Sequence, residues 1–136
     1  ELFVEELFVI VPTTHPLAQQ DAVKYDEVKN EPFIAIKKGN SLRQLVDELF
    51  LEQGIVLNTT FAAEEMHTVA GFVGAGMGVS LIPNIKGLDH YRVERLKVNP
   101  PCYRSVGVSW AKNRYLPPAV VEFRQYLLDY FQQREV

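Results

Sequence analysis

Two short polar segments carry residue types that could bind a small anion. Lys37-Lys38-Gly39-Asn40-Ser41 joins an apolar run to an amphipathic stretch, and Glu64-Glu65-Met66-His67 holds the equivalent place one unit later. Lysine supplies positive charge, glycine allows close backbone approach, and Asn and Ser supply hydrogen bonds. A helix that starts at Ser41 would add unpaired N–H groups and its dipole. The predicted binding residues are Lys38, Gly39, Asn40, Ser41, Glu65, Met66 and His67. An ordinary exposed turn before a capped helix is the alternative that the first segment leaves open.

Residues for catalysis or metal binding are sparse. His15, His67 and His90 are widely separated, and no H-x-x-x-H or C-x-x-C spacing occurs. Residues Glu64 to His67 fit a polar rim better than a metal site, because adjacent residues on such a turn rarely converge on one ion. Cys102 lies between Pro101 and Tyr103, so neither adjacent residue is a base that would activate a thiolate. We therefore expect no catalytic residue, no metal and no cofactor.

The glycine-rich segment Gly71–Pro83, GFVGAGMGVSLIP, invites comparison with a phosphate-binding loop. Such a loop lies between a strand and the helix that follows it. Here the apolar residues before the glycines have helical spacing, and those after them form a short β-rich run. This order predicts a helix end, with Gly76 or Gly78 at positive φ, leading into a buried strand.

Composition indicates a globular chain that stays in the cytoplasm. The 136 residues are 47% hydrophobic and 23% charged, with a formal net charge of −3. No apolar run approaches the roughly 18 residues of a membrane span, and the acidic start does not resemble a signal peptide. A single cysteine fits a reducing compartment. The acidic balance argues against specific DNA binding by this chain, and no membrane partner is expected.

Strands and helices are predicted to alternate as far as Pro83. The strand candidates are residues 7–11, 33–36, 58–62 and 79–82. The clearest helix begins at Ser41 and ends before Gly54, because its apolar residues recur at intervals of three and four. A second helix is predicted over residues 66–76. This alternation favours a parallel, Rossmann-like sheet.

The pattern changes beyond Pro83. We predict a strand over residues 91–98, a break at Pro100-Pro101, a strand over 105–110, and a helix over about 117–133 with one apolar face. A strand that opens the chain and a strand–helix pair that closes it suggest two connections to a second lobe. Most of that lobe would lie outside this chain.

Four segments resemble the effector-binding domain of LysR-type transcriptional regulators in order and spacing. They read ELFVIVPTTHPLA, EPFIAIKKGNSLRQLVDELF, EEMHTVAGFVGAGMGVSLIP and NRYLPPAVVEFRQYL. The resemblance covers essentially the whole chain. It implies an α/β, periplasmic-binding-protein-like (type II) fold: a Rossmann-like lobe plus the C-terminal strand and helix of a largely missing first lobe. Residues 1–11 would be the first crossing strand, 12–103 the second lobe, and 104–136 the second crossing strand and C-terminal helix.

The resemblance also implies a function in sensing. The chain would bind a small, anionic effector between two lobes and control DNA binding by an N-terminal winged helix-turn-helix that this chain lacks. The family's effector domains pair side by side, so a homo-oligomer is expected, with the Ser41 helix in the contact. A transport receptor of the same fold, or an enzyme on that scaffold, remains the alternative.

Overall fold

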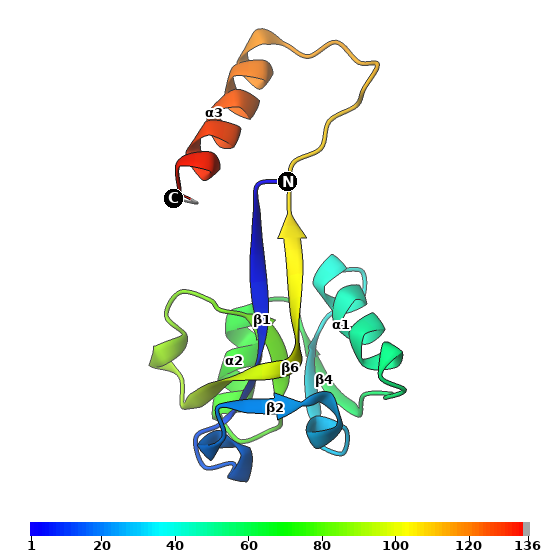
Figure 1. Ribbon diagram of the computed structural model, residues 1–136, viewed down its shortest axis with the longest axis vertical. Coiled ribbons are helices and arrows are strands. Elements are labelled where there is room, and N and C mark those ends of the chain that lie inside the picture. The colour runs from blue at the N-terminus through cyan, green and yellow to red at the C-terminus, as the bar shows by residue number, and fades with distance from the viewer. Residues whose placement is uncertain (135–136) are drawn as a thin grey trace. The chain divides into compact units, whose positions relative to one another are not determined.

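The computed structural model describes residues 1–134, which divide into two compact units. One unit is the continuous segment Glu6–Cys102, and the other combines Glu1–Glu5 with the chain from Tyr103. The strands are β1 (Phe3–Pro12), β2 (Ala22–Lys24), β3 (Phe33–Ile36), β4 (Thr59–Ala63), β5 (Ser80–Pro83) and β6 (Val93–Val106). The α-helices are α1 (Ser41–Glu52), α2 (Met66–Gly74) and α3 (Pro118–Arg134), and three short 3-10 helices cover Pro16–Gln19, Tyr25–Val28 and Leu88–His90 (Figure 1).

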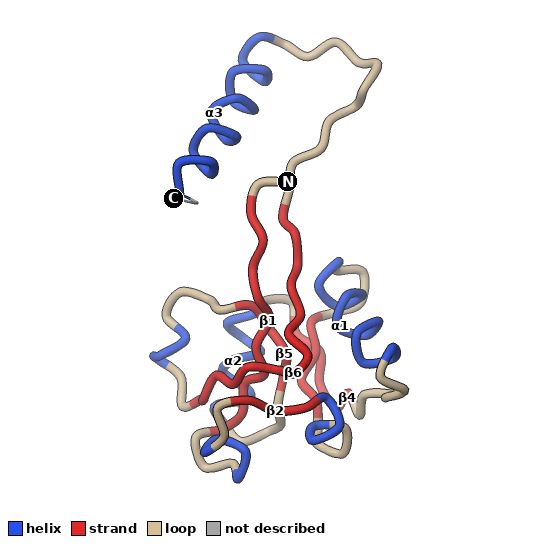
Figure 2. Tube along the Cα trace, in the orientation of Figure 1, coloured by secondary structure: helices blue, strands red, loops and turns tan. Residues whose placement is uncertain are grey.

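The unit Glu6–Cys102 is a mixed sheet with helices packed on it. Strands β2, β6, β1 and β5 are neighbours in that order, and β3 pairs with β4. A parallel bridge between Phe33 and Val79 joins β3 to the residue that precedes β5. Figure 2 shows the strands in red. Strands β3 and β4 run parallel, as their sequence alternation predicts, whereas β1 and β5 are antiparallel. The prediction of a parallel sheet is therefore right for the β3–α1–β4 portion and wrong for the β1–β5 pair.

The core lies between the sheet and the two helices. Strands β3 and β5 are buried along their whole length, as expected for short apolar runs covered on both faces. Helix α1 packs against β3, and α2 packs against β3, β4 and β5. Phe50 of α1 is fully buried and meets Phe33 and Tyr25 edge-on, with ring centroids 5.8 and 5.2 Å apart. These contacts hold the C-terminal end of α1 against the start of β3.

The glycine-rich segment joins a helix to a strand, as predicted. Helix α2 ends at Gly74, two residues before the predicted end, and Gly76 has φ +83°. Such a φ favours glycine, so Gly76 is the residue that turns the chain. Gly78 serves a different purpose. A Cβ there would lie 3.0 Å from the carbonyl carbon of Pro32, so the segments that lead into β3 and β5 approach too closely for a side chain.

The predicted break at Pro100-Pro101 is wrong. Strand β6 runs without interruption from Val93 to Val106 and also replaces the separate strand expected over 105–110. Its parallel partner β2 ends at Lys24, which lies opposite Asn99. The prolines therefore fall where β6 no longer has β2 beside it, and their missing N–H groups cost no bond to that strand.

Helix α3 belongs to the second unit and has no buried residue. Phe131 stacks on Phe3 with ring centroids 5.3 Å apart, and the Arg124 guanidinium lies 4.4 Å from the Trp110 ring centroid. Other apolar side chains of α3, among them Phe123, are exposed. No helix within residues 1–134 is both long and apolar enough to cross a membrane.

Candidate functional site

The first predicted binding segment follows the carboxyl end of β3. Because β3 is buried along its length, it fixes where the exposed residues Lys37 to Ser41 emerge. Gly39 has φ +96°, and a Cβ there would meet nothing within 4 Å. The turn is therefore open to solvent, and its backbone is accessible to a ligand.

Asn40 caps helix α1. The Asn40 side-chain oxygen accepts a hydrogen bond from Leu42 N at 2.8 Å. Ser41 is instead the first helical residue, with an exposed side chain. Within the described residues, the N–H groups of Ser41 and Arg43 meet no protein acceptor. Unpaired N–H groups and the positive end of the helix dipole thus face the same solvent region.

The second predicted segment lies beside the first. Ile36 is paired with Ala63 in the parallel β3–β4 ladder, and Lys37 N donates to Ala63 O at 2.8 Å. The Lys37 ammonium also lies 3.5 Å from a Glu64 carboxylate oxygen. Both of these side chains are mostly exposed, so the ion pair contributes little stability. The pairing of strands, rather than this ion pair, holds the turns together.

The residues of the second segment have different surroundings. Glu65 precedes α2 but makes no side-chain capping bond, so its exposed carboxylate remains available. Met66 is half-buried and packs against the core. The His67 ring is exposed, and its Nδ1 lies 2.9 Å from the Tyr91 hydroxyl. His67 is thus oriented by a residue that lies far from it in sequence.

This geometry suits binding of an anion better than catalysis. Two helices begin side by side at the same edge of the sheet, each adding partial positive charge there. Within residues 1–134, no group of three or more His, Cys, Asp and Glu side chains could hold a metal ion. Cys102 is buried, and burial raises the pKa of its thiol, which keeps the thiol protonated and unreactive.

Two residues near these turns were missed by sequence reasoning. Arg43 donates to Ile36 O at 2.9 Å and pairs with Asp47 at 2.9 Å, which ties α1 to the end of β3. Arg43 and Asp47 are four residues apart, about one helical turn, and this spacing could have predicted their ion pair. Tyr91 reaches His67 only through the tertiary fold, and the local sequence holds no sign of it.

The fold matches the effector-binding domains of known structure. The chain superposes on the "effector binding domain of QuiR in complex with shikimate" with a TM-score of 0.85 and 30% identity, over 97% of this chain and 64% of that one. The CcmR regulatory domain of Synechocystis PCC6803, in complex with 2-PG, matches with a TM-score of 0.82 at 19% identity, over 96% of this chain and 65% of that one. The architecture is the α/β, periplasmic-binding-protein-like type II fold.

The family follows from the sequence. The LysR substrate binding domain matches residues 1–132, so this chain belongs to the LysR family. An uncharacterized HTH-type transcriptional regulator of Bacillus subtilis, YybE, is 44% identical over 98% of this chain and 46% of its own length. The transcriptional dual regulator GltC of the same species is 29% identical, again over 98% of this chain and 46% of its own length. The chain spans about half the length of these relatives, and their names describe regulators rather than enzymes or transport receptors.

Proposed function

We propose that this chain senses a small anionic effector for a LysR-type transcriptional regulator. The effector would bind at Lys38, Gly39, Asn40 and Ser41, with Glu65, Met66 and His67 on the adjacent turn. The observation that carries the proposal is the pairing of Ile36 with Ala63, which places the two turns side by side. The unpaired N–H groups at the start of α1 provide the affinity for an anion.

The domain of QuiR supports this proposal, since it has the same fold and is described in complex with a small molecule, shikimate. Residues 38–41 and 65–67 all lie in the unit Glu6–Cys102, so one continuous segment builds this lobe's share of the site. Lys38 attracts an anion, and the Ser41 hydroxyl and N–H donate to it. Glu65 would repel anions at its own position, so it fits a hydroxyl or amine elsewhere on the effector.

Sensing would work by a shift between conformations of the regulator. An effector changes DNA binding only to the extent that it binds one arrangement more tightly than the other. In this proposal, residues 12–103 form one lobe, residues 1–11 and 104–136 contribute the crossing strands and the last helix, and the remaining lobe comes from the longer protein. The effector bridges the two lobes.

The whole regulator would be a homo-oligomer that binds DNA through an N-terminal winged helix-turn-helix and works in the cytoplasm. The HTH-type names of the relatives support the DNA-binding segment. About 60 residues of helix-turn-helix pattern upstream in the gene would agree with this proposal. Light scattering of the purified regulator tests the oligomer, and a monodisperse monomer at high concentration would contradict it.

The site is tested by Ser41→Ala in the full-length regulator, with inorganic sulfate and phosphate as probes. A hydrogen bond to a charged group contributes roughly 1.5–3 kcal/mol. Isothermal titration calorimetry should therefore show affinity for both anions reduced by about tenfold or more. Ser41 is not the helix cap, so the melting temperature without anion should stay unchanged.

Gln44→Ala is the matched control on the same helix. The Gln44 side chain is exposed and bonds to Glu48, one turn away from the proposed site. This variant should bind sulfate as the wild type does. Equal affinity of the wild type and Ser41→Ala for both anions would refute the site assignment.

A further inference from the structure

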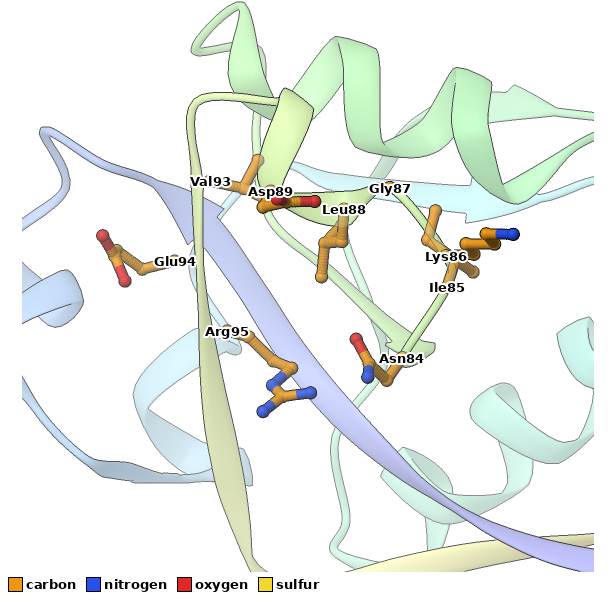
Figure 3. Close-up of a pocket in the computed structure, with 9 residues that line it drawn as sticks. All are labelled: Asn84, Ile85, Lys86, Gly87, Leu88, Asp89, Val93, Glu94 and Arg95. Carbon is orange, nitrogen blue, oxygen red and sulfur yellow. The ribbon is translucent and has the colours of Figure 1, made fainter. Parts of the chain in front are cut away.

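A hollow lies on the unit Glu6–Cys102, next to the turn that carries His67, because a Cβ at its lining residue Gly87 would lie 4.0 Å from His67 Cε1. It has a volume of about 540 Å³ and lies between the segment from Asn84 to Asp89 and the start of β6 (Figure 3). This volume is within the range of sites that hold small organic molecules, roughly 300–1,000 Å³. None of the residues proposed above for the effector lines it.

Two cations line this hollow, Arg95 and Lys86, and Arg95 is the one that extends toward Asn84. Its guanidinium carbon lies 4.5 Å from the centroid of the Phe8 ring, and this stacking holds the side chain over β1. Arg95 takes part in no ion pair or side-chain hydrogen bond within residues 1–134, in contrast with Arg43 and Arg104, which are paired with Asp47 and Glu5. Its N–H groups are therefore available to a ligand.

The neighbouring side chains divide between the two sides of the strand. Figure 3 shows Arg95 extending from β6 toward Asn84, while Glu94 points to the opposite side of the strand. This is the ordinary alternation of side chains along a strand. The Asn84 side chain is exposed and lines the same hollow as Arg95, so its amide is available to donate to a ligand there. Asp89 lies at the other end of the hollow, beside Leu88.

The remaining wall is apolar. Leu88 is only 8% exposed, and Ile85 and Val93 are half-buried against the same core. A ligand that occupied the hollow would therefore meet donors at one end and hydrocarbon along its side. An exposed arginine alone could bind only the charged group of a ligand, whereas this hollow also has an apolar wall for the ligand's hydrocarbon part.

We propose that this hollow is a binding site for a small organic carboxylate. The carboxylate would accept hydrogen bonds from Arg95, whose planar guanidinium matches two carboxylate oxygens, and from the Asn84 amide. The hydrocarbon part would lie against Ile85, Leu88 and Val93. The site is distinct from the one proposed for the effector, and its occupancy is independent of Ser41.

The test is calorimetric titration of the full-length regulator with hexanoate. Hexanamide is the neutral control of the same length, and acetate lacks the hydrocarbon body. Hexanoate should bind at least tenfold more tightly than either control. Arg95→Gln keeps a chain long enough to cover Phe8 but removes the charge, so it should weaken hexanoate binding by about tenfold or more.

Arg92→Gln provides the matched control, because it makes the same change three residues away at an exposed position that does not line the hollow. It should bind hexanoate as the wild type does, and so should Ser41→Ala. The proposal is overturned if hexanoate produces no binding, if hexanamide binds equally well, or if Arg95→Gln binds hexanoate with wild-type affinity. If Ser41→Ala weakened hexanoate binding and Arg95→Gln did not, hexanoate would be bound at the effector site, and the proposal would also be overturned.

Discussion

The close contact between Gly78 and Pro32 should make Gly78→Ala strongly destabilising. The added methyl group would press against the Pro32 carbonyl, lie 3.0 Å from its carbon, and lie 3.3 Å from Cδ1 of Ile34. The Pro32 carbonyl is backbone and accepts a hydrogen bond from Val79 N at 2.9 Å, while Ile34 N donates to Val79 O at 2.9 Å. The methyl group therefore cannot be accommodated by a change of rotamer.

The magnitude follows from these contacts. Overpacking a well-packed interior costs about 1–3 kcal/mol, and weakening two hydrogen bonds adds about 0.5–1.5 kcal/mol each. We expect the free energy of unfolding to fall by about 3 kcal/mol. Since β3 leads directly to Lys37–Ser41, sulfate affinity should fall as well.

Urea unfolding of the complete effector-binding domain, followed by circular dichroism, measures this change. Gly71→Ala, inside helix α2, is the control, because its Cβ would lie 3.9 Å from Tyr91 Cε1, an ordinary van der Waals contact. Alanine is the better helix former, so this variant should be about 0.5–1 kcal/mol more stable than the wild type. A Gly78→Ala variant as stable as the wild type would refute the reasoning.

Two further predictions concern the helix cap and the buried thiol. Asn40→Ala removes the bond to Leu42 N and should lower the free energy of unfolding by about 1 kcal/mol in urea, whereas Ser41→Ala should leave it unchanged. An equal loss in both variants would show that the cap is misassigned. Cys102 should resist thiol reagents at pH 8 until the protein is unfolded, and rapid reaction of the native protein would contradict its burial. Burial raises the pKa of the Cys102 thiol, so the folded protein binds the thiol proton more tightly than the unfolded chain does. The free energy of unfolding should therefore be highest below the ordinary thiol pKa of about 8.5 and should fall as pH rises through the pKa of the folded protein. In urea titrations at pH 8 to 10, Cys102→Ala should show a smaller fall than the wild type.

The βα alternation was predictable because its signals are local. The run Phe33–Ile36 is apolar throughout, and the apolar positions of α1 recur at helical spacing up to Gly54, which has φ +74°. The turn at Gly76 was equally readable from the order of helix, glycines and strand. The family resemblance supplied the fold class, which periodicity alone would have left as a Rossmann-like sheet.

The missed features depend on residues far apart in the chain. Strand β1 begins at Phe3, earlier than predicted, because β6 lies beside it as a hydrogen-bonding partner. The sequence hid this start because the charged Glu5 and Glu6 interrupt the apolar pattern. Strand β6 passes through two prolines because β2 has ended there. The hollow beside Arg95 could not be anticipated, since Asn84 and Phe8 reach it only after the sheet has formed.

One unit is continuous in the sequence and the other is assembled from two separate segments, which affects the order in which they fold. Glu6–Cys102 is continuous, so a ribosome delivers that unit complete before synthesis reaches α3. The other unit combines Glu1–Glu5 with the segment from Tyr103, and the Ser105 hydroxyl donates to the Glu1 carboxylate across a separation of 104 residues. Closing so long a loop costs more entropy in an unordered chain than after the intervening segment has folded. We expect Glu6–Cys102 to gain protection from hydrogen exchange first during refolding, and its folded form to act as the template that brings Glu1 and Ser105 together.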